Sequence, residues 1–306
     1  MKIAYLILAH HMPVHLNKLL DALNSEESVF FIHVDLKSDI NFFQRFKETN
    51  VKLIDERVNL NRFGFSNPIA MINLITAAQS ENCFDYYIIL SGQDYPIKSN
   101  AYIQKYLSKN KGTSFINFYP LFKGADMYDW VTKHYYVDYY ASFPKLIVKH
   151  IKRIEDLINR FLPERKLPFG YIPYRGSQWT CLYKDVVIYL LYFINSTQEG
   201  KEILNFFKSV KCPEEILFQT IIINSKFAKT CRYFDRDVLN NNKFMKNENK
   251  AYLHYIDWDP DREDPAILDE SDFVAISKSE FLFARKFDEV KSRRLLEMID
   301  SQLLKL

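Results

Sequence analysis

Glycine and cysteine are scarce in this sequence, and neither forms a recognisable motif. The 306 residues include only 7 glycines and 4 cysteines, whereas hydrophobic residues make up 48% of the chain. So little glycine beside so much apolar material excludes a disordered or low-complexity chain. The cysteines show no Cys-x-x-Cys pair and no disulfide-dense spacing, which is typical of a protein in a reducing compartment. These four residues are Cys83, Cys181, Cys212 and Cys231.

Long apolar runs and an excess of one charge are missing as well. The longest apolar run that we find, Val186–Ile194, is far shorter than the about 20 residues that a membrane span needs. The apolar run after Met1 is too short for a signal peptide and is typical of a buried first strand. The net charge is only +3, which is too balanced for the strongly basic face of a nucleic-acid binder. We therefore expect a cytoplasmic globular protein without a nucleic-acid partner.

Short apolar runs alternate with helical patterns in the first third of the chain. The expected strands are residues 2–10, 29–35, 51–54 and 86–92, and the expected helices are residues 13–23, 40–48, 68–79 with Ser66 as the cap, and 99–109. Alternation of this kind predicts an α/β fold with a mainly parallel sheet covered by helices on both faces. We treat residues 1–306 as one domain with a C-terminal appendix, in which residues 1–120 bind a nucleotide and residues 121–306 bind the acceptor and carry catalysis.

Polar residues follow several of these strands, where parallel sheets bind their ligands. The strand ends read "AHH" at 9–11, "HVDLKS" at 33–38 and "SGQD" at 91–94. The sequence contains neither GxGxxG nor GxxxxGK[ST], and the absence of these motifs argues against a Rossmann dehydrogenase and a P-loop NTPase. By analogy alone, the glycosyltransferase type A (GT-A) fold is the remaining nucleotide-binding fold of this size.

The segment Lys145–Leu162 has the pattern of a basic amphipathic helix. Apolar side chains recur at helical spacing among lysines and arginines, at Ile147, Ile151, Ile154, Ile158 and Phe161. One interpretation is an ordinary helix packed on the domain. The other is a helix that adsorbs to an anionic membrane surface.

Two adjacent glutamates follow Pro213 at the start of an apolar helical pattern. Acidic residues at this position often only complement the helix dipole. A carboxylate held by a rigid helix start can also serve as a general base. The sequence therefore offers Glu214 and Glu215 as candidates for two different tasks.

Metal sites find little support in the sequence. His11 and His15 are four residues apart, but Pro13 lies between them and no cysteine or carboxylate ligand is nearby. Asp-x-Asp triplets, which hold a divalent ion against a diphosphate in many sugar-nucleotide enzymes, occur at 235–237 and 259–261. Both lie far downstream in sequence typical of turns, whereas the expected strand end carries only Asp94.

Eight segments together resemble the core-2/I-branching enzymes, the family of β-1,6-N-acetylglucosaminyltransferases and peptide O-xylosyltransferases known as glycosyltransferase family 14. They occur in the family's order between positions 5 and 288, and the form "FARKF" is closer to xylosyltransferase-like and bacterial members than to animal branching enzymes. The segments are "YLILAHHMPVHLNKLL", "FIHVDLKS", "GFS", "YYIILSGQDYPIKSN", "GSQW", "CPEEILFQT", "YIDW" and "FLFARKFD".

The resemblance implies a GT-A fold, a UDP-sugar donor, inversion at the anomeric carbon and no required metal or other cofactor. Asp35 matches the family's acidic contact on the uracil and ribose side, Glu215 its catalytic base, and Lys286 the lysine that meets the diphosphate. His254 stands where the family has an arginine, which puts neutralisation of the diphosphate at neutral pH in doubt. Arg285 or the nearby Arg262 is a candidate for the missing charge.

The predicted site then has two parts. The donor side is formed by Asp35, Arg285, Lys286, His254, His10, Arg62 and Asp94, with Arg62 on the position of a family tyrosine. The acceptor side is formed by Trp179, Tyr233 and Ser177.

The expected reaction is a single in-line displacement. Glu215 removes a proton from an acceptor hydroxyl while Lys286 neutralises the departing UDP. The expected partners are a UDP-sugar, with N-acetylglucosamine or xylose as the sugar, a glycan or glycolipid acceptor, and the inner membrane as a peripheral contact. Two alternatives stay open: a metal-dependent enzyme that uses an Asp-x-Asp triplet, and a non-catalytic sugar-binding protein.

Overall fold

A five-stranded sheet forms the centre of the computed structural model, which describes residues 1–43, 49–232, 234, 252–259, 261–263 and 265–305. Its strand order is β3-β2-β1-β4-β8, with β1 Ile3–Ala9, β2 Ser28–Val34, β3 Val51–Leu53, β4 Tyr86–Ser91 and β8 Cys181–Tyr183. The first four strands run parallel, and β8 pairs antiparallel with β4. Because β1 and β4 are buried on both faces, their sequences are continuous apolar runs instead of alternating ones.

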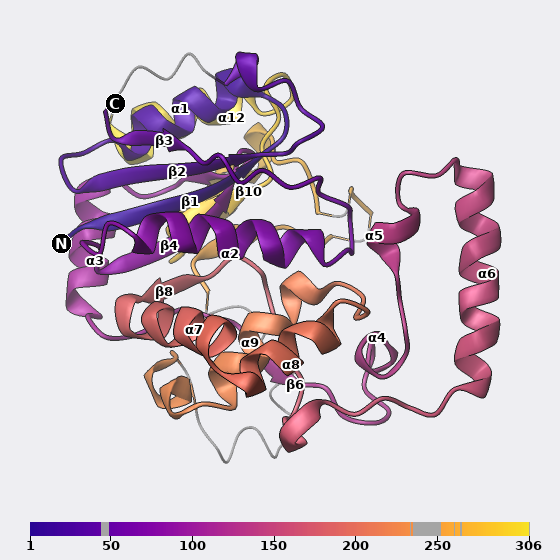
Figure 1. The fold of residues 1–306 in the computed structure, drawn as a ribbon. Coiled ribbons are helices and arrows are strands. Elements are labelled where there is room, and N and C mark those ends of the chain that lie inside the picture. The colour runs from indigo at the N-terminus through magenta and orange to yellow at the C-terminus, as the bar shows by residue number, and fades with distance from the viewer. Residues whose placement is uncertain (44–48, 233, 235–251, 260, 264, 306) are drawn as a thin grey trace.

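Helices cover both faces of this sheet (Figure 1). One face packs against α1 Pro13–Leu23, α3 Asn100–Lys109 and α12 Arg293–Ile299. The other face packs against α2 Ser66–Gln79, α7 Lys184–Ser196, α8 Gln198–Phe207 and α9 Leu217–Ile223. The expected α/β fold with a mainly parallel, helix-covered sheet is therefore confirmed.

A second sheet brings the end of the chain to the carboxyl edge of β4. It has the order β5-β10-β9, with β5 Tyr95–Pro96, β9 His254–Ile256 and β10 Phe283–Arg285. β10 is antiparallel to β5, which follows β4 by three residues, and parallel to β9. The segments "SGQD", "YIDW" and "FARKF" thus meet in space although almost 200 residues separate the first from the last.

The remaining elements connect these two sheets. They are β6 Tyr119–Pro120, β7 Tyr174–Arg175, α4 Asp129–Thr132, α5 Val137–Tyr140, α6 Lys145–Phe161, α11 Phe273–Lys278 and the short turns η1 Ile40–Phe42, η2 Pro168–Gly170, η3 Pro213–Glu215, η4 Lys226–Thr230, η6 Glu270–Asp272 and η7 Asp300–Leu304. β6 and β7 form an antiparallel pair. No described helix is long and apolar enough to cross a membrane.

Two local predictions differ from the structure. The helix expected over residues 40–48 is a single turn, η1, followed by residues 44–48 that lie outside the described part. Ser66 does not cap α2, because the helix begins at Ser66 itself. Its hydroxyl instead donates to Oδ1 of Asp138 at 2.8 Å and accepts from the backbone of Asn61 at 2.9 Å.

Candidate active site

The carboxyl ends of β1 and β2 place Asp35 close to His10. The backbone N–H of Asp35 donates to the carbonyl of Ala9 at 2.8 Å, and its buried carboxylate accepts from the backbone of Lys37 at 3.0 Å. Nζ of Lys37 lies 3.5 Å from the other oxygen. His10 is exposed and stacks on His11 with ring centroids 4.0 Å apart. Burial and His11 lower the pKa of His10, while the charge of Asp35 acts in the opposite sense. These two predicted donor residues are therefore brought together.

Arg57, which the sequence analysis missed, fixes the loop that carries Asp35. Its guanidinium donates to three backbone carbonyls, those of Val34 at 2.9 Å, Asp35 at 2.8 Å and Ser38 at 2.7 Å. A single arginine between Glu56 and Val58 gives no sequence signal for this role, because its hydrogen-bond partners among the described residues are main-chain carbonyls.

Asp94 is completely buried at the carboxyl end of β4, with 0% of its side chain exposed. Its oxygens accept from the backbone N–H and the hydroxyl of Ser91 at 2.8 and 2.7 Å. Arg285 and His254 also approach it, at 3.6 and 3.3 Å. Burial opposes ionisation of Asp94, but these neighbours outweigh it and lower the pKa of its carboxyl. In the structure Asp94 holds Arg285 and His254, and its contact with a donor stays a prediction.

Arg285 and His254 share a buried layer with Trp179. The guanidinium carbon of Arg285 lies 3.8 Å from the centroid of the Trp179 ring, and His254 stacks on Phe283 at 5.3 Å. Burial lowers the pKa of His254 despite Asp94, so its imidazole is neutral at pH 7. His254 therefore does not replace the charge of the family arginine. Trp179 is buried as well, so its predicted acceptor contact has no exposed ring in this structure.

Lys286 directly follows Arg285 in the sequence, but its side chain is more exposed to solvent. Its ammonium lies 3.6 Å from a carboxylate oxygen of Glu263, and 20% of its side chain is exposed. Glu263 is itself largely exposed and also pairs with Lys291 at 3.2 Å. Exposed ion pairs of this kind contribute only about 0–1 kcal/mol. A diphosphate can therefore displace Glu263 from Lys286 at small cost.

Other predicted cations and carboxylates are elsewhere. Arg262 is bound to Asp257 at 2.7 Å and to Asp272 at 2.8 Å, so it is already neutralised. Arg62 is exposed, with its guanidinium over the ring of Phe63. Tyr233 and the triplet 235–237 lie outside the described residues.

Asp259 and Asp261 of the second Asp-x-Asp triplet are exposed, and Pro260 between them lies outside the described residues. Oδ1 of Asp259 accepts the backbone N–H of Asp261 at 3.0 Å, which is a turn-stabilising bond. Within the described residues, no group of three His, Cys, Asp or Glu side chains is arranged to hold a metal ion. His15 is separated from His10 and His11, since it is buried and bonded to the carbonyl of Asp94 at 3.1 Å.

Glu215 lies in η3 and is held by Arg175, a residue that the sequence analysis missed. Nε and Nη2 of Arg175 donate to the same oxygen, Oε2, at 2.9 and 2.5 Å. None of the hydrogen bonds between described residues uses Oε1, and 30% of the side chain is exposed. The carboxylate is thus fixed through one oxygen while the other is available to an acceptor.

Glu214, its neighbour, is in a different environment. Its Oε2 is buried and has no hydrogen-bond partner among the described residues. Burial raises the pKa of Glu214 to about 8, from an ordinary value of 4.5. The two glutamates after Pro213 are both half-buried, but they differ in environment: Glu214 has a buried, unpaired Oε2 and a raised pKa, whereas Glu215 is held by a cation.

The loop Gly176–Trp179 connects Glu215 with the buried layer. The backbone N–H of Gly176 donates to the carbonyl of Glu215 at 2.8 Å, and Trp179 at the other end covers Arg285. A Cβ on residue 176 would lie 1.8 Å from the carbonyl oxygen of Asn117, so only glycine fits. Ser177, predicted to contact the acceptor, is half-buried and accepts from the backbone of Trp179 at 3.3 Å.

Aromatic rings and cations line the side of Glu215 that faces α4. The Arg175 guanidinium and the Lys211 ammonium each lie 5.1 Å from the Trp130 ring centroid. Lys211 also lies 5.7 Å from the ring of Tyr135. Aromatic surfaces with polar neighbours are suited to sugar rings as well as to cations.

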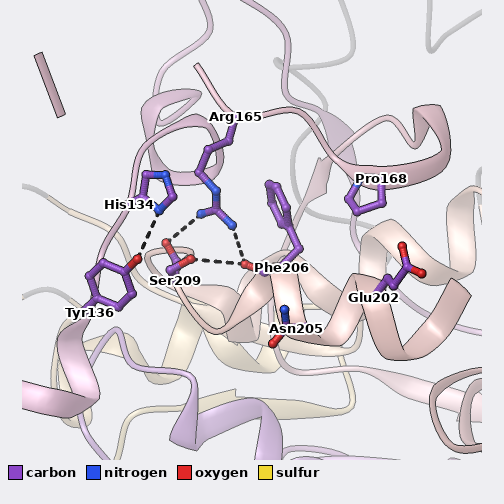
Figure 2. Close-up of a pocket in the computed structure, with 8 residues that line it drawn as sticks. All are labelled: His134, Tyr136, Arg165, Pro168, Glu202, Asn205, Phe206 and Ser209. Carbon is purple, nitrogen blue, oxygen red and sulfur yellow. Dashed lines mark hydrogen bonds between the residues drawn. The ribbon is translucent and has the colours of Figure 1, made fainter. Parts of the chain in front are cut away.

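A polar pocket of about 340 Å³ opens beyond this aromatic group (Figure 2). It is lined by His134, Tyr136, Arg165, Pro168, Glu202, Asn205, Phe206 and Ser209, none of which was predicted as a site residue. The guanidinium of Arg165 donates to the carbonyls of Ser209 and Phe206 at 3.1 and 2.7 Å, so it serves to hold the segment after α6. The pocket is therefore separate from the predicted donor residues.

The arrangement described above agrees with a comparison of the sequence with known families. A sequence model of the Core-2/I-Branching enzymes matches residues 3–277. The chain belongs to the Core-2/I-Branching enzyme family. This membership confirms the resemblance that the eight motifs indicated.

Within this family, the chain is similar to animal xylosyltransferases. Xylosyltransferase oxt of Drosophila melanogaster is 26% identical over 316 residues, which cover 99% of this chain and 33% of the relative. Xylosyltransferase 2 of Homo sapiens is 26% identical over 327 residues, which cover 99% and 34%. The xylosyltransferase of Ciona intestinalis is 25% identical over 321 residues. The chain spans about a third of the length of these relatives.

Proposed function

We propose that this Core-2/I-Branching family member is an inverting, metal-independent glycosyltransferase. It moves N-acetylglucosamine or xylose from a UDP-sugar to a hydroxyl of a glycan or glycolipid. The observation that carries the proposal is the state of Glu215, whose Oε2 is held by Arg175 while Oε1 remains available. A carboxylate fixed in this manner is suited to removing a proton from an incoming hydroxyl.

The base is assigned to Glu215 and not to Glu214. Oε2 of Glu214 is buried, and the raised pKa of about 8 keeps most of this carboxyl protonated at neutral pH, so it is not suited to accept a proton there. Glu215 is partly exposed, and Arg175, which holds it, lies over the aromatic rings of Trp130 and Tyr119, which provide a surface for an acceptor sugar. Inversion follows because one base suffices for a single displacement without a covalent intermediate.

Lys286 is assigned to the diphosphate. Asp94 and Arg285 form a buried pair, so their charges offset each other, and His254 is neutral. Lys286 is then the accessible cation of the segment "FARKF", and its partner Glu263 is weakly held. A compact ammonium beside the departing β-phosphate stabilises the negative charge that develops there.

The nucleoside is assigned to the strand ends that carry Asp35 and His10, with Arg62 two residues after Leu60, whose backbone N–H lies 3.4 Å from Oδ1 of Asp35. Asp35 keeps a fixed position because its backbone and carboxylate are bonded within its own loop. Its side-chain oxygens are natural acceptors for the hydroxyls of a ribose. The UDP-sugar would then extend from these strand ends toward Lys286.

Both xylose and N-acetylglucosamine are candidates for the sugar that the donor carries. The similar proteins named above are called xylosyltransferases, whereas the name of the family refers to branching enzymes. The name of a relative at 26% identity does not fix the sugar, so the donor has to be measured.

The test is transfer from a panel of labelled UDP-sugars to oligosaccharide acceptors, in EDTA and in manganese. Transfer in EDTA that inverts the anomeric centre is expected. Transfer only with manganese would replace the proposal by a metal-dependent enzyme. No transfer and no UDP binding under either condition would indicate a non-catalytic protein.

A further inference from the structure

We propose that α6 is a docking helix for an anionic lipid surface. The two predictions for this helix, packing on the domain and adsorption to a membrane, differ in where its apolar face points. In the structure, this face points away from the protein. The proposal does not depend on the sugar-transfer function, because no predicted site residue lies on α6.

The hydrogen bonds that attach α6 to the protein come from polar residues, beside the half-buried Val148 and Ile151 on the same side of the helix. The amide of Asn159 exchanges two hydrogen bonds with the backbone of His134, at 2.9 and 2.8 Å. One turn earlier, Glu155 accepts from the backbone of Tyr136 at 2.9 Å and from the hydroxyl of Tyr140 at 3.3 Å. Asn159 is the only buried residue in α6, all of whose residues are described. α6 is therefore attached by polar bonds, whereas ordinary helices are attached by an apolar stripe.

Six of the eight apolar side chains of α6 are exposed, and the other two, Val148 and Ile151, are half-buried. The exposed fraction is 82% for Phe161, 69% for Leu146 and 57% for Ile154, and Ile147, Leu157 and Ile158 are exposed as well. Figure 1 shows α6 at the edge of the molecule, beyond α4 and α5 and away from both sheets. So much exposed apolar surface on one helix marks an interaction site, because monomers rarely leave it in water.

The charge of α6 selects the partner. The helix carries five basic residues, Lys145, Lys149, Lys152, Arg153 and Arg160, against the two acidic residues Glu155 and Asp156. Of these two, Glu155 is already used in contacts within the protein. A two-fold dimer through α6 would bring two basic helices together, which costs free energy. A surface of anionic lipid supplies the opposite charge and an apolar layer at once.

The geometry fits a helix that lies in the plane of the lipid surface. At 100° per residue, Ile147, Ile154 and Phe161 fall on one side of α6, while Lys149, Arg153 and Arg160 fall on an adjoining side. Long basic side chains at such a boundary reach the lipid headgroups while the apolar side chains enter below them. In the segment after α6, Arg165 donates a hydrogen bond to the carbonyl of Ser209. Ser209 lies two residues before Lys211, whose ammonium lies over the ring of Trp130 near Glu215.

The experiment is co-sedimentation of the full chain with vesicles of phosphatidylglycerol and phosphatidylcholine in equal parts, and with phosphatidylcholine alone. Wild type is expected to bind the mixed vesicles and to prefer them over neutral ones by about tenfold or more. The triple variant Leu146→Ser/Ile154→Ser/Phe161→Ser is expected to lose at least about tenfold in affinity for them. Because these side chains are exposed, the melting temperature should stay near that of wild type.

Two matched controls separate α6 from the rest of the surface. Ile188→Ser/Tyr192→Ser/Val274→Ser removes three exposed hydrophobic side chains elsewhere and should bind like wild type. A second pair of variants tests the charge. The α6 variant Lys149→Gln/Lys152→Gln/Arg153→Gln should lose the preference for anionic lipid. The control Lys105→Gln/Lys109→Gln/Lys111→Gln removes the same charge on and just after α3 and should keep that preference.

Three results would overturn the proposal. One is wild-type protein that does not bind anionic vesicles. Another is equal loss in the α6 variants and in their controls. The third is a wild-type dimer in analytical ultracentrifugation that becomes a monomer in the α6 variants, while vesicle binding does not change. That result would make a second copy of the chain the partner of α6. Transfer to a soluble acceptor should be unchanged in all α6 variants, so failure here is distinguishable from failure of the proposed function.

Discussion

Both hydrogen bonds from Arg175 to Glu215 end on the same carboxylate oxygen. Nε and Nη2 of the arginine lie 2.9 and 2.5 Å from Oε2, and Oε1 receives no bond from the described residues. Arg175 itself lies over the ring of Trp130 and donates to the hydroxyl of Tyr119. The carboxylate is therefore oriented by a cation whose own position is fixed by aromatic neighbours.

Replacing Glu215 by glutamine should reduce kcat by about 10²–10⁴-fold, because the amide cannot accept the proton. The affinity for UDP should change little, because Glu215 is assigned to the acceptor side. The matched variant Glu214→Gln should keep most of the activity, since a protonated carboxyl and an amide are similar in size and polarity. Steady-state kinetics of both variants would decide the assignment, and loss of activity in Glu214→Gln alone would transfer the role of base to Glu214.

Arg175 acts as a positioning residue in this account. Arg175→Ala should lower kcat by about tenfold or more, while KM for the donor stays near the wild-type value. Arg175→Lys should recover part of kcat, because one charged donor to Oε2 is retained. A merely structural role would instead lower the melting temperature and change both parameters together. A full kcat in Arg175→Ala would show that Glu215 needs no orientation.

Glu214 should make the stability of the protein depend on pH. Its pKa is about 8 in the folded chain and about 4.5 when exposed, so the folded state holds a proton that the unfolded state releases between these values. Its stabilising contribution is complete below pH 4.5 and is lost as pH rises through about 8. In that window, the free energy of unfolding should fall by up to about 1.4 kcal/mol per pH unit on account of this group.

Urea unfolding between pH 5 and 8.5 gives the slope of the free energy of unfolding against pH, which can be compared between wild type and variants. The wild-type slope should be steeper than that of Glu214→Gln, whereas the exposed control Glu280→Gln should match wild type. Identical slopes in all three proteins would mean that Glu214 is ionised in the folded state.

The buried pair of Asp94 and Arg285 should contribute strongly to folding. Asp94→Asn leaves the guanidinium buried without its carboxylate, which typically costs about 3–5 kcal/mol. The double variant Asp94→Asn/Arg285→Met should be less destabilised than the single one, because no unpaired charge remains. Chemical unfolding with Asp259→Asn as an exposed control would measure both, and a single variant within about 0.5 kcal/mol of wild type would contradict the pairing.

The parts of the fold that depend on local pattern were predictable. Uninterrupted apolar runs indicated β1, β2 and β4, and Pro13 marked the start of α1 where the structure has it. Ser66 was taken for a cap because serine suits that position, but its hydroxyl is used by Asp138, 72 residues away. A pairing over such a distance leaves no mark in the local pattern.

The sequence named candidate residues for the site but did not predict how deeply each would be buried or what it would contact. The motifs named Glu215, Asp94, His254 and Lys286, but whether a side chain is buried depends on how β9 and β10 pair beside β5. Arg175 lies 40 residues from Glu215 and was not singled out. The amphipathic pattern of α6 was recognised, yet the same pattern suits a helix with its apolar face turned inward or outward.

Titration of UDP into the protein by calorimetry in EDTA, with wild type beside Lys286→Ala, tests the central claim most directly. Lys291→Ala is the matched control, because Lys291 pairs with the same Glu263 at 3.2 Å but was not assigned to the diphosphate. The account predicts binding of UDP without metal, a loss of about tenfold or more in Lys286→Ala, and little change in Lys291→Ala. Binding that requires manganese, or binding that Lys286→Ala leaves intact, would contradict a metal-free diphosphate site built on Lys286.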